Sequence, residues 1–124
     1  GIKTTLIIDN AAWTFMDQCS KVFVGADTVT KDGCVINKIG TAELALVAKH
    51  FKKDFYVATQ MLKIDKTRSA EQVVIEERPA GEIIDPKRIP KAKIRNPVFD
   101  ITKPEFISKI ITERGVFGAK ELVK

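Results

Sequence analysis

The sequence predicts an α/β fold: a Rossmann-like, three-layer domain in which helices flank a mainly parallel sheet. Two observations predict it. Continuous apolar runs of strand length alternate with segments of helical spacing, and runs of this kind are typical of parallel strands covered on both faces. The connections between them are short, so successive strands are expected to pair in parallel through right-handed crossovers. A chain of 124 residues, 44% of them hydrophobic, suits a single domain over 1–124.

The first elements form a strand–helix–strand unit. Thr4–Asp9 (TTLIID) is predicted to be a buried strand because it contains a continuous apolar run. Asp9 or Asn10 can cap a short helix over Ala11–Asp17 by accepting hydrogen bonds from its free backbone N–H groups. Lys21–Asp27 (KVFVGAD) is expected to be a second strand of the same character.

A turn, a helix and a third strand follow. The Asp-Gly pair at 32–33 is a turn signal, since glycine adopts positive φ at little cost. With Gly40 or Thr41 as its cap, a helix is predicted to run to about Phe51, with one apolar stripe facing inward. Asp54–Thr59 (DFYVAT) is the predicted third strand.

The last third of the chain is predicted to hold a strand and a helix. A weak apolar piece lies near Met61–Ile64, and Glu71–Glu77 (EQVVIEE) is expected to be a fourth strand. The run TKPEFISKIITERG carries helix punctuation, with a capping box formed by Thr102 and Glu105, and with Gly115 able to close the end. This pattern predicts a C-terminal helix.

Several classes of function are disfavoured. No GxGxxG follows the first strand and no GxxxxGK[ST] loop is present, so neither dinucleotide binding nor nucleotide hydrolysis is supported. Cys19 and Cys34 fit neither a zinc pattern nor a disulfide framework, so we expect no metal site and a reducing, cytoplasmic compartment. We also expect no cofactor. No apolar run is long enough to span a membrane.

The net charge of +5 permits anionic partners without selecting one. The one basic cluster, Pro86–Arg95, is interpreted as a lysine-protected edge strand or loop. Nucleic-acid binding is the alternative, but no aromatic platform or groove-reading helix accompanies the cluster. We therefore expect no specific nucleic-acid partner.

Polar side chains gather where the predicted parallel strands end, which is where ligands bind in open α/β sheets. Asp9, Asp27 and Thr59 all fall there. Asp9 is interpreted as a helix cap. Asp27 could act as an acid or base if burial raised its pKa, and the alternative is a carboxylate that closes the loop by bonding to backbone N–H groups.

The residues before the second helix suggest an anion site. Lys38 can neutralise a phosphate, and the free N–H groups near Gly40 and Thr41 can donate to its oxygens. Asn37 lies beside the lysine. The alternative is an exposed lysine and a turn asparagine, and the pattern alone leaves both open.

Four segments together resemble a known family: VFVGADTVTKDGCVINKIGTAELALVAK (Val22–Lys49), FYVAT (Phe55–Thr59), VIEERPAGEI (Val74–Ile83) and RNPVFDITKPEFISKIITERGV (Arg95–Val116). The chain resembles the family that joins 5-methylthioribose-1-phosphate isomerase, archaeal ribose-1,5-bisphosphate isomerase and the regulatory subunits of translation initiation factor 2B. The matching part is that family's C-terminal, Rossmann-like domain. The resemblance implies that the chain is the second half of a longer protein.

The resemblance also implies roles for the candidate residues. In the isomerases the aspartate of GAD is a catalytic acid/base and the Asn-Lys pair binds the substrate, which implies these roles for Asp27, Asn37 and Lys38, with Gly40 and Thr41 beside them. The family's partner in proton transfer is a cysteine on an upstream segment, and neither Cys19 nor Cys34 occupies its motif. The isolated chain is therefore expected to be inactive.

Two functions follow from the resemblance. Retention of Asp27, Asn37 and Lys38 favours an aldose–ketose isomerase acting on a phosphorylated pentose, since the regulatory subunits tend to replace the acid. The TQMLKIDK stretch (Thr59–Lys66) lacks the APxST-like pattern of the methylthioribose phosphate enzymes. It is nearer to the corresponding stretch of the bisphosphate isomerases and of the regulatory subunits, without matching either well, and the resemblance as a whole favours the ribose-1,5-bisphosphate type. The alternative is a non-catalytic regulatory subunit that binds a translation factor. Homo-oligomerisation is implied for either.

Overall fold

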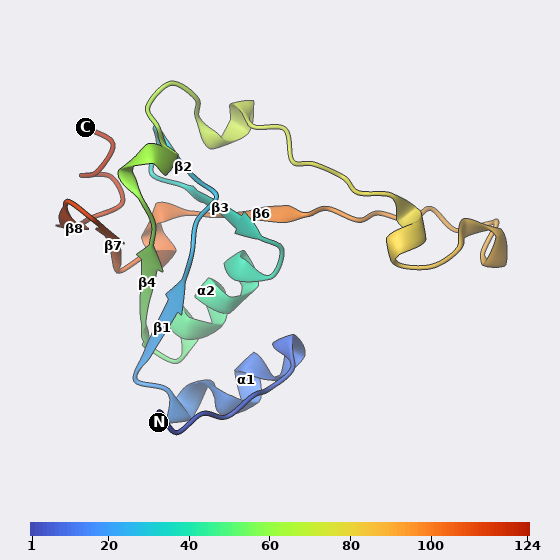
Figure 1. Cartoon of the computed structure of the whole chain (residues 1–124), viewed down its shortest axis with the longest axis horizontal. Helices are drawn as coiled ribbons and strands as arrows, with labels where there is room; N and C mark the ends of the chain where they lie inside the picture. Colours follow the sequence, from blue (N-terminus) through green and yellow to red (C-terminus); the bar gives the residue numbers. More distant parts are fainter.

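A computed structural model describes all residues, 1–124, as two four-stranded sheets that share one ten-residue helix (Figure 1). The strands are β1 (Lys21–Val24), β2 (Thr28–Thr30), β3 (Val35–Lys38), β4 (Asp54–Ala58), β5 (Ile64–Asp65), β6 (Phe99–Thr102), β7 (Lys109–Thr112) and β8 (Gly115–Phe117). The helices are α1 (Ala12–Phe15) and α2 (Thr41–His50), and short 3₁₀ turns lie at Asp9–Ala11, Met16–Gln18, Met61–Lys63, Ala70–Gln72, Ala80–Glu82, Pro86–Arg88 and Pro104–Phe106.

The first sheet has the strand order β1-β4-β7-β8. β1, β4 and β7 run parallel, and only the last strand is antiparallel. Side chains from these parallel strands, including Phe55, Val57 and Ile110, are almost completely buried and form the centre of the core. The predicted α/β class, with parallel strands flanked by helices, is confirmed.

α2 is the helix that the sequence predicted after the turn, and it ends within one residue of the expected position. Gly40 precedes it with φ of 100°, a left-handed conformation that glycine adopts most easily. Ala45 and Ala48 are buried, and the helix contacts β4 of the first sheet and β6 of the second. The first predicted helix is shorter than expected, since only Ala12–Phe15 is α-helical between two 3₁₀ turns.

The second sheet, with the order β5-β2-β3-β6, was not predicted. β2 and β3 form an antiparallel hairpin around the predicted Asp-Gly turn, in which Gly33 has φ of 79°. A Cβ at this position would lie only 3.0 Å from the carbonyl oxygen of Ala119, so glycine is required for space as well as conformation. The strands are too short to show a period-2 pattern, which explains why sequence analysis missed the sheet.

Two predicted strands are absent. Thr4–Asp9 pairs with no other strand and is exposed, with Leu6 at 95% relative accessibility. Glu71–Glu77 contains the end of a 3₁₀ turn and one isolated bridge to Pro97 instead of a strand. Both runs contain enough apolar residues for a strand, but neither finds a sheet edge in this fold, and both remain largely exposed.

The predicted C-terminal helix is also wrong. β6 ends at Thr102, Pro104 starts a single 3₁₀ turn, and the chain then forms β7 and β8. The segment after the turn is rich in β-branched residues, which favour a strand once one face can be buried. Gly115, expected to end a helix, instead begins β8 directly after the tight turn, with φ of 130°.

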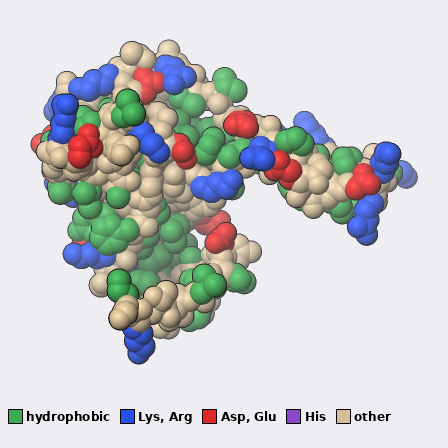
Figure 2. All heavy atoms as spheres, viewed as in Figure 1, with side chains coloured by type: hydrophobic (Ala, Val, Ile, Leu, Met, Phe, Trp, Pro, Cys, Tyr) green, Lys and Arg blue, Asp and Glu red, His purple; other side chains and the backbone are tan.

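Residues 73–98 form an arm that extends from the body of the molecule (Figure 1). Two hydrogen bonds, Val98 N to Glu76 O and Arg78 N to Asn96 O, close its base at 3.0 Å each. The basic cluster Pro86–Arg95 lies towards its far end, where Figure 2 shows several Lys and Arg side chains. Of the interpretations offered above, the cluster is a loop and not an edge strand. No helix in the chain has the length and apolar character needed to cross a membrane.

Candidate functional site

Asp27 lies on the short connection between β1 and β2, at the carboxyl end of a parallel strand. Its backbone N–H donates to the carbonyl oxygen of Ile36 at 2.9 Å, which fixes the residue at the mouth of the hairpin. The residue is exposed, and it lines an open hollow of about 550 Å³. The other lining residues are Thr28, Leu62, Lys63, Ile64, Asp65, Lys66, Thr67 and Arg68.

Three of these lining residues are cationic, and sequence analysis missed all of them. Lys63 precedes β5, which pairs in parallel with β2 so that Val29 lies opposite Ile64. The Lys63 ammonium donates to the carbonyl oxygen of Ala26 at 2.9 Å, beside Asp27. An ammonium has three donors, so two remain for a ligand. The sequence signal was present in the TQMLKIDK stretch, but nothing in it showed that this segment would pair beside β2.

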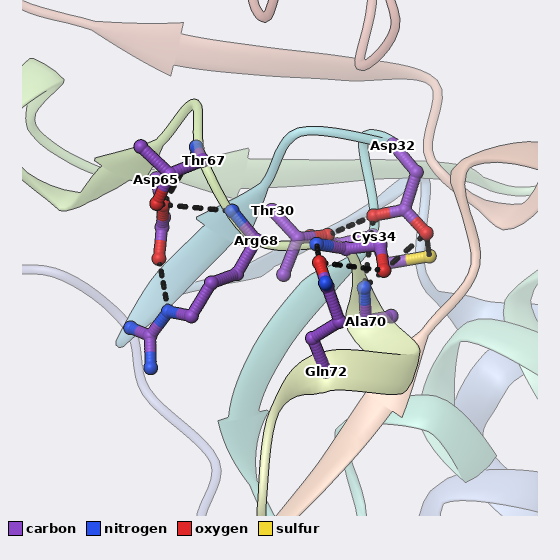
Figure 3. Close-up of polar contacts among 9 residues, drawn as sticks. Thr30, Asp32, Cys34, Asp65, Thr67, Arg68, Ala70 and Gln72 are labelled. Atoms are coloured by element: carbon purple, nitrogen blue, oxygen red, sulfur yellow. Dashed lines mark hydrogen bonds and ion pairs between the residues drawn. The ribbon is translucent and has the colours of Figure 1, made fainter.

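The turn after β5 is held by a single carboxylate (Figure 3). Asp65 accepts hydrogen bonds from the backbone N–H and hydroxyl of Thr67, at 2.8 and 2.6 Å, and from the backbone N–H of Arg68 at 3.1 Å. Its second oxygen pairs with the Nε of Arg68 at 2.6 Å. The hydrogen bonds from Thr67, followed by those from Arg68, hold the pKa of the Asp65 carboxyl well below its usual range.

A second carboxylate fastens this segment to the β2–β3 hairpin. Asp32 accepts from the hydroxyl of Thr30 at 2.5 Å and from the backbone N–H of Ala70 at 3.1 Å (Figure 3). The hydrogen bond from Thr30 is the main cause of a lowered pKa at Asp32. The backbone N–H of Lys31 also donates to the carbonyl oxygen of Arg68 at 3.0 Å. The three cationic residues Lys63, Lys66 and Arg68 form what we call the cationic wall of the hollow. The segment that carries this wall is thus anchored at both ends.

Cys34 lies under this hairpin and does not reach the hollow. Its thiol donates to Asp32 at 3.7 Å, and burial, reinforced by that carboxylate, raises its pKa to about 11. A thiol with this pKa stays protonated at neutral pH and is a poor nucleophile. The chain brings no three His, Cys, Asp or Glu side chains together in an arrangement that could hold a metal ion.

Asn37 lies next to Asp27 across the hairpin. Thr28 pairs with Ile36, so continuing the antiparallel register by one residue places Asp27 opposite Asn37. The Asn37 amide donates to the hydroxyl of Thr41 at 3.1 Å, and its oxygen would lie 3.9 Å from a Cβ at Gly25. The structure therefore brings Asn37 near the acid that the sequence singled out.

Lys38, Gly40 and Thr41 line a different hollow, of about 580 Å³, between the start of α2 and the segment around Trp13. The resemblance implies that they act on one substrate with Asp27, yet Asp27 does not line this hollow, because side chains alternate along β3 and Lys38 follows Asn37. Lys38 is exposed and has no hydrogen-bond partner. The Thr41 hydroxyl donates to the carbonyl oxygen of Lys38 at 2.7 Å, so it holds the turn together.

The start of α2 is already occupied by a carboxylate of the same chain. Asp100 on β6 accepts from the backbone N–H of Gly40 at 2.8 Å and from that of Ala42 at 3.1 Å. These are the donors that the sequence offered to a phosphate. A carboxylate here satisfies the open N–H groups and complements the helix dipole, so a phosphate would have to displace it. Sequence analysis missed Asp100 because it lies about sixty residues away along the chain.

Fold and site together define an α/β protein with a cation-rich hollow at the carboxyl ends of its parallel strands, built around one aspartate. The chain belongs to the initiation factor 2 subunit family, whose model matches residues 1–119. The family resemblance read from the motifs is thereby confirmed.

Similar proteins include both enzymes and translation factors. The chain is 48% identical to a ribose 1,5-bisphosphate isomerase of Archaeoglobus fulgidus over 93% of its own length and 37% of that protein's. It is 44% identical to a methylthioribose-1-phosphate isomerase of Bacillus cytotoxicus, over 94% of this chain and 35% of the relative. The chain thus spans little more than a third of the length of these relatives.

The similar solved structures include both a translation factor subunit and an isomerase. The delta subunit of translation initiation factor eIF-2B from A. fulgidus superposes with a TM-score of 0.82 at 42% identity, covering 90% of this chain and 34% of that one. The 5-methylthioribose 1-phosphate isomerase of Pyrococcus horikoshii gives a TM-score of 0.83 at 35% identity, covering 94% of this chain and 34% of that one. The fold alone therefore does not separate the two functions.

Proposed function

We propose that this chain supplies the proton-transferring carboxylate of a sugar-phosphate aldose–ketose isomerase, and that its substrate is a phosphorylated pentose. The observation that carries the proposal is the position of Asp27, at the end of a parallel strand in a hollow lined by Lys63, Lys66 and Arg68. Cations around a carboxylate suit a substrate that carries phosphate while it exchanges protons. We place the protein in the cytoplasm.

The chemistry explains why one carboxylate is needed twice. A pentose phosphorylated on its anomeric oxygen cannot open its ring by losing a proton from a C1 hydroxyl. Asp27 would instead donate a proton to the ring oxygen as the bond between that oxygen and C1 breaks. The hydrogen on C2 then moves to the electron-poor C1 with its electron pair, as a hydride, and the C2 hydroxyl returns a proton to Asp27 as the ketone forms. Every atom is retained, and Asp27 ends in the state in which it began.

The other candidate residues take supporting roles in this proposal. Asn37, opposite Asp27, would bind the substrate, and Lys38 on the next position would meet a phosphate from the adjoining hollow. Gly40 and Thr41 would hold the Asn37–Lys38 turn in place and not bind the phosphate themselves. The reason is that Asp100 occupies the N–H of Gly40, while the Thr41 hydroxyl is bonded within the turn.

The second candidate function is that of a regulatory subunit without catalysis, which would bind a translation factor. The likeness to the eIF-2B delta subunit, at 42% identity, favours it. Either protein is proposed to act as a homo-oligomer. Co-purification together with an activity assay distinguishes the two functions. A regulatory subunit should associate stably with a translation factor and should convert no sugar phosphate.

The test is the replacement Asp27→Asn in the complete gene product that contains these residues. Conversion of ribose 1,5-bisphosphate and of methylthioribose 1-phosphate to their ketoses should fall by about 100-fold to 10,000-fold, the range for one general acid–base group. Thermal unfolding should be unchanged, because Asp27 is exposed and only its backbone is bonded. Asp85→Asn, an exposed aspartate on the arm, is the matched control and should retain full activity. Normal turnover by Asp27→Asn would refute the role.

A further inference from the structure

Thr41 lies in the first turn of α2 and contacts the side chain of Asn37, four residues earlier on β3. Its hydroxyl donates to the carbonyl oxygen of Lys38 at 2.7 Å and lies 3.1 Å from the amide nitrogen of Asn37. Only 7% of Thr41 is exposed, so solvent offers its hydroxyl few other partners. The two contacts tie the end of β3 to the start of the helix.

The direction of the Asn37 amide follows from the number of protons available. A threonine hydroxyl has one proton, and a carbonyl oxygen can only accept, so that proton is used on Lys38. Towards Asn37 the hydroxyl can then only accept, which requires the amide to turn its NH₂ group to Thr41 and its oxygen away. That oxygen would lie 3.9 Å from a Cβ at Gly25, on the connection that leads from β1 to Asp27.

The Asn37 oxygen is an acceptor without a partner in the chain. It receives no hydrogen bond, and it is not sealed in the core, since the side-chain atoms that are buried without a partner belong to Thr59 and Thr102. An uncharged acceptor near Asp27 suits a hydroxyl group, which can donate a hydrogen bond to it. It does not suit a phosphate, whose ionised oxygens are acceptors as well.

Asp100 holds the backbone on both sides of Thr41. It lies opposite Asn37 in the pairing of β3 with β6, and its carboxylate accepts from the backbone N–H groups of Gly40 and Ala42, at 2.8 and 3.1 Å. A carboxylate at the start of a helix also complements the helix dipole. The contacts therefore form one connected path from β6 through the start of α2 to the Asn37 amide.

We infer that Thr41 and Asp100 are positioning residues for the Asn37 amide. They keep its oxygen turned towards the Gly25–Asp27 segment, and position 37 therefore binds a sugar hydroxyl and not a phosphate. The inference rests on the proposed isomerase function, which it deepens by stating what Asn37 recognises. Because Thr41 and Asp100 act only through this amide, their effect on catalysis should vanish when position 37 has no amide to orient.

The kinetic test is a double-mutant cycle in the complete gene product, on whichever pentose phosphate the native protein converts. Thr41→Val keeps the shape of the side chain but removes both contacts, so kcat/KM should fall by about tenfold, the effect of one lost hydrogen bond. Thr41→Ser keeps both contacts and should stay within about twofold of the native value. In an Asn37→Ala background, Thr41→Val should cost less than about twofold more. Asp100→Ala should behave like Thr41→Val, and Asp100→Asn, which keeps one acceptor oxygen, should lose less.

Thr112→Val is the matched control. The Thr112 hydroxyl also donates to a backbone carbonyl, that of Gly115 at 3.2 Å, and it accepts from the backbone N–H of Arg114 at 3.1 Å. Thr112 lines neither hollow, so its replacement should change kcat/KM by less than about twofold. Additive losses from Thr41→Val and Asn37→Ala, or equal losses in Thr41→Val and Thr41→Ser, would overturn the inference and leave the isomerase proposal standing.

An NMR measurement tests the orientation of the amide without any turnover. In the complete gene product labelled with isotopic asparagine, the side-chain amide signal that is missing from Asn37→Ala identifies Asn37. Its protons should exchange with water slowly in the native protein and in Thr41→Ser, and faster in Thr41→Val. Added inorganic phosphate should leave the signal in place. Equal exchange in all three proteins would overturn the role of Thr41, and a shift with phosphate would overturn the assignment of position 37 to a hydroxyl. Thermal unfolding establishes that each variant is folded.

Discussion

At the scale of single residues, two aspartates occupy the two places where the sequence predicted contacts with a substrate. Asp27 faces the cation-rich hollow, whereas Asp100 fills the start of α2 where a phosphate was expected. The sequence identified Asp27 because it ends a strand, and a strand end is a local signal. Asp100 could not be assigned, since its bonding partners depend on the pairing of β3 with β6. Long-range pairing of this kind leaves no trace in a single sequence.

Cys34 provides a residue-scale prediction about pH. Its folded-state pKa is raised from 9.0 to about 11, mainly by burial, so the folded protein binds this proton more tightly than the unfolded chain does. The resulting stabilisation is complete below pH 9 and is lost as the pH rises towards 11. The free energy of unfolding, from urea denaturation at pH 8 and pH 10.5, should therefore fall more steeply for the native protein than for Cys34→Ala. Parallel pH profiles for the two proteins would contradict the burial of this thiol.

At the scale of elements, local sequence signals predicted the correct structure where packing in the core favours the same structure. The strand over Lys21–Val24, the helix α2 and the strand over Asp54–Ala58 follow directly from apolar runs and caps. The C-terminal segment shows the opposite case. Thr102, Pro104 and Glu105 read as the start of a helix, but pairing with β4 draws the following residues into a strand, and tertiary packing overrides the local preference.

The assignment of the C-terminal segment to strands, and not to a helix, can be tested at Ile110 and Val116. In β7 the Ile110 side chain is fully buried against the parallel sheet, while Val116 on β8 is 59% exposed. Ile110→Ala should lower the free energy of unfolding by about 2–5 kcal/mol, the usual range for such a change in a core. Val116→Ala should cost less than about 1 kcal/mol. Urea denaturation measures both, and equal losses would contradict the assigned strand register.

At the scale of the whole molecule, the two sheets create two separate hollows on either side of the β2–β3 hairpin. Asn37 lies between them, bonded to Thr41 on one side and opposite Asp27 on the other. The class of fold and the position of Asp27 just after a parallel strand could be predicted from sequence. The cationic wall at 63–68 could not, because it becomes part of the site only when β5 pairs with β2. The site is thus assembled by the sheet that sequence analysis failed to predict.

The account depends most on the claim that a phosphorylated pentose binds in the Asp27 hollow and not at the start of α2. A crystal structure of the Asp27→Asn variant of the complete gene product with ribose 1,5-bisphosphate tests this directly. The account predicts the ring oxygen within about 2.6–3.2 Å of the side chain at position 27, in the hollow that Lys63, Lys66 and Arg68 line. A ligand seated between Lys38 and Asp100, with position 27 facing solvent, would contradict it.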